Sequence, residues 1–240
     1  MPIINFSHQK GGVGKSLLSY HLAYLLKDNY DVQLLDLDNQ KSLSSIHKLR
    51  NHKLQQHSIP IKTVHSKHEL IDLINSIDDN QYLIIDSGGF DSLYTRLAIL
   101  GADINISPTA DKTIELLALV TAYDSTLHQL SRKLRKNISC YVLLNRIHHS
   151  AKDFSHIDSL LSKSKHLKML THPLLHHKII VRERVIYDQI LLDGLAINEL
   201  PKNKLDKRHF YSALRDIELL RDSIILHLKL PKHKKVHNFS

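Results

Sequence analysis

Residues 7–16 read Ser7-His8-Gln9-Lys10-Gly11-Gly12-Val13-Gly14-Lys15-Ser16. The apolar run Ile3-Ile4-Asn5-Phe6 precedes this stretch, and the apolar segment 17–26 that follows it is typical of a helix. The order therefore predicts a strand, a glycine loop and a helix. In such a loop the backbone N–H groups turn inward toward a phosphate chain, and the amino end of the helix adds its positive dipole.

A loop of this kind uses its lysine and its hydroxyl residue for different purposes. We expect Lys15 to contact the β- and γ-phosphates of ATP and the Ser16 hydroxyl to bind Mg²⁺. The stretch departs from the general pattern G-x-x-x-x-G-K-[ST] at Gln9, where that pattern has glycine. An ordinary glycine-rich turn is the alternative, but three of the seven glycines in the chain fall within four positions here.

The run from Lys10 to Ser16 resembles the deviant Walker A box of the ParA/MinD ATPases, in which a second lysine precedes the glycines. The resemblance implies catalytic roles for Lys10 and Lys15, with Lys10 reaching across an ATP-bound homodimer to the nucleotide of the partner. It implies a nucleotide-binding set of Gly11, Gly12, Val13, Gly14, Lys15, Ser16 and Leu17. The α/β fold that we expect is a single doubly wound, mostly parallel sheet flanked by helices. This domain would cover residues 1–230, and we expect residues 231–240 to form a basic, disordered tail.

A strand predicted over residues 30–35 ends at Asp36-Leu37-Asp38. Ligand residues collect at the carboxyl edge of open α/β sheets, and residues two apart on an extended segment point the same way. Asp36 and Asp38 can therefore both face a metal or a water beside the γ-phosphate. The segment resembles the family's Asp-x-Asp-Pro-Gln box, with Asn39 in place of proline, which implies that Asp38 positions the attacking water. We assign Asp36 to the metal site; a plain Asp-Asn turn is the alternative.

The apolar run 81–85 ends at Asp86-Ser87-Gly88-Gly89 and reads as a Walker B strand. We expect Asp86 to hold Mg²⁺, mostly through water. The two glycines would let a backbone amide approach the γ-phosphate. A buried strand that ends in a turn is the alternative.

Further elements follow from the apolar periodicity. We predict helices over 68–77, 90–100, 112–134 and 206–229, and strands over 59–64, 102–107 and 138–144. The last of these strands ends at Asn145-Arg146, which resembles the family's Asn-Lys/Arg element. The resemblance implies that the Asn145 amide recognises adenine, with Arg146 beside it; the alternative is a strand-end cap.

The net charge of +9 is unevenly distributed. Residues 1–120 carry 11 Lys and Arg against 13 Asp and Glu, whereas residues 121–240 carry 22 against 11. A cationic half attracts nucleic acid or anionic lipid, and a solvated basic surface is the alternative. The segment 180–197 resembles a late segment of partition ATPases, which implies DNA contacts by Arg184 and the nearby Arg182. An ion pair with Glu183 or Asp188 is the alternative.

Cysteine and histidine usage narrows the possible functions. Cys140 is the single cysteine, so the chain lacks the ligands for an iron–sulfur cluster, and we expect Cys140 in the core. The 19 histidines lack an accompanying cluster with ligand spacing, so we do not expect them to form a metal site.

Together these features predict a ParA-like partition ATPase, most similar to the short partition ATPases. Its expected partners are a second copy of itself, non-specific DNA and a ParB-like or other adaptor protein that stimulates hydrolysis. A MinD-like positioning or conjugation-accessory ATPase is the alternative, and a dethiobiotin-synthetase-like ligase is a third. Because the sequence has no apolar run of membrane-spanning length and no signal segment, we expect a cytoplasmic protein that is nucleoid-associated when ATP-bound.

Overall fold

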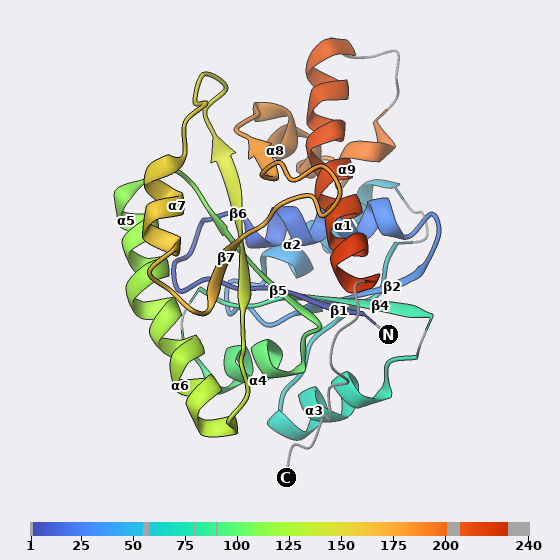
Figure 1. Ribbon diagram of the computed structural model, residues 1–240. Helices are drawn as coiled ribbons and strands as arrows, with labels where there is room; N and C mark the ends of the chain where they lie inside the picture. Colours follow the sequence, from blue (N-terminus) through green and yellow to red (C-terminus); the bar gives the residue numbers. More distant parts are fainter. Residues whose placement is uncertain (1, 55–57, 79, 90, 201–206, 230–240) are drawn as a thin grey trace.

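The computed structural model describes residues 2–54, 58–78, 80–89, 91–200 and 207–229. Its centre is a sheet of eight parallel strands in the order β3-β2-β4-β1-β5-β6-β7, with β8 pairing with the later part of β6 (Figure 1). The strands are β1 (Ile3–Phe6), β2 (Asp31–Asp36), β3 (Ile61–Lys62), β4 (Gln81–Asp86), β5 (Ile104–Thr109), β6 (Cys140–Ile147), β7 (Leu167–Met169) and β8 (Ile180–Arg182). The predicted doubly wound α/β fold is confirmed.

Helices cover both faces of the sheet (Figure 1). The helices are α1 (Lys15–Leu26), α2 (Ser42–Leu54), α3 (Lys67–Ser76), α4 (Leu93–Gly101), α5 (Thr113–Ala118), the π-helix η1 (Leu119–Tyr123), α6 (Asp124–Leu134), α7 (Ser155–Leu161), α8 (Val185–Leu191), the 3₁₀-helix η2 (Ile197–Glu199) and α9 (Lys207–Lys229). One core packs α1, α8 and α9 on one face, where Ile4 and Phe6 point. On the opposite face α3 and α4 pack near Ile3, and α5 to α7 pack near Val142.

The strand register brings the predicted site residues to one edge. Phe6 pairs with Asp86 between β1 and β4, and Asp86 pairs with Asp36 between β4 and β2. Because all three strands are parallel, the segments that follow them leave the sheet at the same carboxyl edge. The fold thus places the glycine loop and both acidic strand ends together.

Three predicted elements were wrong in their bounds or form. The helix predicted over 112–134 is continuous from Thr113 to Leu134, but its middle is the π-helix η1, in which Tyr123 is buried. The strand predicted over 59–64 is only two residues long, because only Ile61 and Lys62 pair with β2. Pro108 lies inside β5 and not after it; β1 pairs with β5 only as far as Ile106, so the missing N–H of proline interrupts no pairing on that side.

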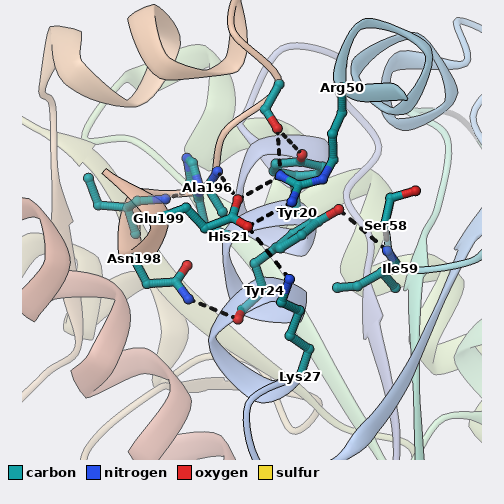
Figure 2. A network of polar contacts seen from close by, with 12 residues as sticks. Tyr20, His21, Tyr24, Lys27, Arg50, Ser58, Ile59, Ala196, Asn198 and Glu199 are labelled. Carbon is teal, nitrogen blue, oxygen red and sulfur yellow. Dashed lines mark hydrogen bonds and ion pairs between the residues drawn. The ribbon is translucent and has the colours of Figure 1, made fainter. Parts of the chain in front are cut away.

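A buried ionic network joins α1, α2 and the segment before α9, and we call it the Arg50 network (Figure 2). It comprises Tyr20, Tyr24, Arg50, Gly194 and Glu199. Arg50 of α2 forms a bidentate pair with Glu199 at 2.7 and 2.8 Å and also donates to the Gly194 carbonyl at 2.9 Å. Its guanidinium lies 4.3 Å from the centre of the Tyr24 ring, and the Tyr20 hydroxyl donates to the same Gly194 carbonyl at 2.7 Å. The network fixes α2, which follows Asp36 and Asp38, against α1, which follows the glycine loop.

The predicted tail over 231–240 lies outside the described residues. Among the helices that the structure does describe, none has both the length and the apolar character that crossing a membrane requires.

Candidate functional site

The phosphate loop, residues 7–14, connects β1 to α1. Two of its glycines have left-handed backbones, with φ of +73° at Gly12 and +97° at Gly14. A Cβ atom on Gly14 would lie 2.3 Å from the amide nitrogen of Asn145, so this position requires glycine. Among the residues that the structure describes, no side chain forms a capping hydrogen bond at the start of α1. The open N–H groups of this helix and its dipole form an anion-binding site at the end of the loop.

Lys15 begins α1 and is buried, with 4% of its surface exposed. Within the described ranges its Nζ atom donates one long hydrogen bond, to the carbonyl oxygen of Lys10 at 3.4 Å. Burial lowers the pKa of Lys15, and the charges of Asp86 and Asp38 oppose that effect. An ammonium group held with so little hydrogen bonding is suited to bind an anion, because a buried cation is costly without a partner.

Asp86, the last residue of β4, is fully buried. Neither of its carboxylate oxygens has a hydrogen-bond partner among the described residues. Burial raises the pKa of Asp86 to about 7, an effect that the adjacent Ser16 and Lys15 oppose. A hard divalent cation takes carboxylate and hydroxyl oxygens as ligands. The residues present therefore fit Mg²⁺, which Asp86 and Ser16 would hold.

The two aspartates after β2 have different contacts. Asp36 accepts hydrogen bonds from the backbone nitrogen and the hydroxyl of Ser44, at 3.0 and 2.7 Å, and from the backbone nitrogen of Asp38 at 3.1 Å. Oδ2 of Asp36 thus fixes the start of α2 to the end of β2, Oδ1 fixes the turn at Asp38, and the role of Asp36 at a metal stays a prediction. One oxygen of Asp38 accepts the backbone N–H of Gln40 at 3.0 Å. The charge of Asp38 acts on Lys15, which agrees with a position beside the phosphates.

The loop after β4 lies against the phosphate loop. A Cβ atom on Gly89 would come within 2.8 Å of the backbone nitrogen of Gly11, so this approach requires glycine. Ser87, two residues before Gly89, is bonded to β1. Its hydroxyl donates to the Asn5 side chain at 2.7 Å, and its backbone N–H donates to the Phe6 carbonyl at 3.0 Å. The loop after β4 is therefore held against both the phosphate loop and the end of β1.

Asn145 and Arg146, near the end of β6, brace the phosphate loop. The Asn145 amide nitrogen donates to the Val13 carbonyl at 2.8 Å. The Nη1 atom of Arg146 donates to the Gly12 carbonyl at 2.6 Å, and the Arg146 backbone is left-handed, with φ of +54°. These hydrogen bonds are of the kind that a strand-end cap makes, which was the alternative considered for this pair. Recognition of adenine by Asn145 stays a prediction.

Glu115 of α5 belongs to the site, although the sequence reasoning missed it. Its buried carboxylate accepts hydrogen bonds from Arg146 Nη2 at 2.5 Å and from the Ala110 N–H at 2.9 Å. The Nζ atom of Lys10 lies 3.9 Å from the same carboxylate. An acidic residue in the first turn of a helix is common because it complements the helix dipole. Its position in the sequence therefore gave no signal of these contacts.

The π-helix and α6 contact the start of the phosphate loop. The Tyr123 hydroxyl shares a hydrogen bond of 2.5 Å with the Ser7 hydroxyl, and the Gln9 amide donates to the Thr126 hydroxyl at 3.1 Å. Both contacts join residues more than 110 positions apart. They give a structural use to Gln9, the position at which the loop departs from the general pattern.

Arg182 and Arg184, the predicted DNA contacts, have partners within the chain. Arg182 Nη1 donates to the carbonyl oxygens of His148 and Ala151, each at 2.8 Å. Arg184 Nε donates to Asp216 of α9 at 3.0 Å. An ion pair was the alternative considered for Arg184, but its partner is Asp216 and neither of the two acids expected from the sequence. The DNA contact of these arginines stays a prediction.

The phosphate loop, the two acidic strand ends and the braced glycines together describe a nucleotide site. A model of the CobQ/CobB/MinD/ParA nucleotide binding domain matches residues 4–185. The chain belongs to this family. The match includes Lys10, Lys15, Asp38, Asp86 and Asn145 and ends at Val185, the first residue of α8. No curated protein matches the chain by sequence.

Solved structures share the fold of this CobQ/CobB/MinD/ParA family member. A chain of the MinC:MinD cell division protein complex from Aquifex aeolicus has a TM-score of 0.66 at 18% identity, covering 98% of this chain and 99% of that chain. A protein from Borrelia burgdorferi, described as a candidate plasmid partition protein and bound to AMPPNP, has a TM-score of 0.63 at 18% identity, covering 91% and 98%. MinD from Pyrococcus horikoshii, complexed with Mg-ADP, has a TM-score of 0.59 at 15% identity, covering 91% and 93%. At these identities the likeness shows the fold alone.

Proposed function

We propose that the chain is a ParA-like partition ATPase. ATP would drive its dimerisation, the dimer would bind DNA without sequence preference, and a ParB-like or other adaptor would stimulate hydrolysis. This cycle would move a plasmid or a chromosome. The protein would be cytoplasmic and would associate with the nucleoid while ATP is bound.

The observation that carries the proposal is the contrast between the two lysines of the phosphate loop. Lys15 is buried beneath the loop, whereas the Lys10 side chain is 40% exposed and meets Glu115 only at 3.9 Å. A single pocket for one nucleotide has no need of this second, outward cation. A second subunit docked at this edge would give Lys10 a phosphate to contact, as the resemblance to the ParA/MinD ATPases implies.

The remaining side chains suit hydrolysis of a phosphoanhydride. Lys15 and the first-turn amides of α1 would stabilise negative charge that develops on the phosphates, and Asp38 would orient the attacking water. Mg²⁺, when bound, supplies charge neutralisation to the phosphate oxygens. Ser16 and Asp86 would hold this ion, and the fully buried, unpartnered carboxylate of Asp86 supports that assignment.

The test is binding of random-sequence duplex DNA at moderate salt with ATP, with ADP and without nucleotide. We expect tight binding with ATP only, and its loss in Lys15→Ala and Lys10→Ala. The Lys10→Ala variant should still bind nucleotide, because its side chain lies outside the buried pocket. DNA binding that is absent, or indifferent to nucleotide, would contradict the proposal and favour a positioning switch that acts on a membrane or a protein.

A further inference from the structure

A second group of cations lies far from the phosphate loop. Residues 131–137 and 162–168 contain seven Lys and Arg and no Asp or Glu. The first segment ends α6 and leads into β6, and the second leads into β7. Both therefore lie toward the amino edge of the parallel sheet, opposite the nucleotide site (Figure 1).

The second segment lies across a groove of about 390 Å³ from η1 and α6, and we call this the α6 groove; the first segment follows at the end of α6, beyond the lining residues. Its walls are Thr121, Asp124, Ser125 and His128 on the helix side and residues 163–166 on the other. Two contacts hold the walls together. The Ser164 hydroxyl donates to Asp124 at 2.5 Å, and the rings of His128 and His166 meet edge to face at 5.7 Å.

The cations around the α6 groove differ from the arginines at the other sites. Arg50, Arg146 and Arg184 each pair with a carboxylate. In contrast, six side chains of the two segments are exposed, and the structure records no ion pair for any of them with the described residues. They are Lys163 and Lys165 on the groove wall, and Arg132, Lys133, Arg135 and Lys136 at the end of α6 and just after it. Asp124 is the acid among the groove-lining residues, and it is occupied by Ser164.

A structural role accounts for only part of this charge. Arg132 and Lys133 lie in the last turn of α6, where cations complement the helix dipole. Lys163 follows the C-cap of α7, where a cation can have the same role, but Lys165 lies in the loop before β7 and has no such role. Arg135 has a left-handed backbone with φ of +49°, a conformation in which glycine is less costly than arginine. The charge at this position is therefore not explained by the fold.

We propose that the α6 groove binds the phosphate backbone of duplex DNA. The inference rests on the proposed function and deepens it, because it assigns the DNA contact to this groove and not to Arg182 and Arg184, whose guanidinium groups have partners within the chain. A concave site with Lys163 and Lys165 on one wall, and further exposed cations where α6 ends, matches a ridge of phosphates better than a flat bilayer. Leu134 is the large apolar side chain exposed among these cations, and an interfacial membrane helix needs a whole apolar face.

The position of the groove also fits an ATP-driven switch. If two copies dock through the carboxyl edges of their sheets, where the nucleotides would bind, the amino edges of both sheets stay uncovered. The dimer would then present two α6 grooves, and two linked sites raise the avidity for a long duplex without any new contact. A monomer would retain weak binding through one groove.

The test compares two double variants that remove the same charge. Lys163→Gln/Lys165→Gln alters the groove, and Lys62→Gln/Lys67→Gln removes two exposed lysines of β3 and α3 at the other edge of the sheet. With ATP, the groove variant should bind random duplex DNA at least about tenfold more weakly. The slope of log K against log salt should fall by about 2, at about 0.9 for each lost phosphate contact. The control should bind as the unaltered protein does.

A third variant removes charge without a cost to folding. Arg135→Gly relieves the left-handed strain, so its thermal stability should be retained while its DNA affinity falls. Nucleotide binding and hydrolysis should be unchanged in all three variants. If the unaltered protein binds no DNA, or binds anionic vesicles instead, both the proposed function and this inference fail. If it binds DNA with ATP and the groove variants match it or match the control, only the α6 groove assignment is overturned.

Discussion

Two buried polar clusters lie along α1, and they are built in opposite ways. At the amino end of the helix, the phosphate-loop cluster contains Lys15 and Asp86, which are buried and have few or no partners in the described chain. Further along the same helix, the Arg50 network pairs its guanidinium with Glu199, a backbone carbonyl and an aromatic ring (Figure 2).

The difference separates charges that stabilise the fold from charges kept for a ligand. Burial of an ion is tolerable when its partner is supplied by the chain, as for Arg50 and Glu199. The phosphate-loop cluster leaves that partner to be supplied from outside. A nucleotide with Mg²⁺ carries both of the charges that this cluster lacks.

The largest effect is expected in the Arg50 network. Arg50→Ala leaves the Glu199 carboxylate without its bidentate partner and opens a space against Tyr24. We expect a loss of about 3–5 kcal/mol in the free energy of unfolding, as for other broken buried pairs. Urea unfolding measures it. A loss under 1 kcal/mol would show that this network is not the self-sufficient cluster described here.

Substitution of Asp86 should increase stability, in contrast to Arg50→Ala, when nucleotide and metal are absent. Because burial raises the pKa of Asp86 from 3.8 to about 7, its contribution to stability is full below pH 4 and is lost as the pH rises through 7. Asp86→Asn removes this penalty. We expect it to exceed the unaltered protein in stability at pH 8 by up to about 4 kcal/mol, and to match it near pH 4. Urea unfolding with EDTA across this range would reveal it; parallel pH profiles would contradict the assignment.

Lys15→Ala should separate binding from folding. We expect nucleotide affinity to fall by about 100-fold or more, roughly 3 kcal/mol, because the buried cation for the phosphates is gone. The free energy of unfolding should stay unchanged or increase, since the variant no longer buries an ammonium group. Fluorescent-nucleotide titration and urea unfolding measure the two quantities. A large loss of stability would mean that Lys15 serves the fold, as Arg50 does.

The smallest effect is expected at His21, beside the Arg50 network (Figure 2). Burial lowers the pKa of His21 to about 3, and its Nδ1 atom accepts the Ile197 N–H at 3.3 Å. The folded chain keeps this ring neutral, so stability is lost as the pH falls below 6.5. Between pH 7.5 and pH 5 we expect this residue to cost about 2 kcal/mol. The His21→Asn variant should lose less stability over that interval, and an equal loss would argue against this residue as a source of acid sensitivity.

The sequence predicted those parts of the site that arise locally. The strand, glycine loop and helix over residues 3–26 follow from residue order, and Asp38 and Asp86 follow strands whose carboxyl ends a parallel sheet must bring together. The doubly wound fold and the family are confirmed.

The parts that escaped prediction depend on contacts between distant positions. Glu115 meets Arg146, Tyr123 meets Ser7, and Arg50 meets Glu199 across 149 positions. No local pattern marks such a pair, because each residue alone is ordinary for its helix or loop. The π-helix inside the predicted helix 112–134 was also missed, and its Tyr123 makes such a distant contact, with Ser7.

The most direct test of the central claim is thermal unfolding of the unaltered protein with Mg-ATP, with ATP and EDTA, and without nucleotide. If the phosphate-loop cluster is kept for a magnesium nucleotide, saturation at about 100 times Kd should add about 2.7 kcal/mol and raise Tm by roughly 5–10 °C. EDTA should remove most of the increase, and Asp86→Asn should show no difference between the two ATP conditions. A Tm that is the same in all three conditions would contradict the claim.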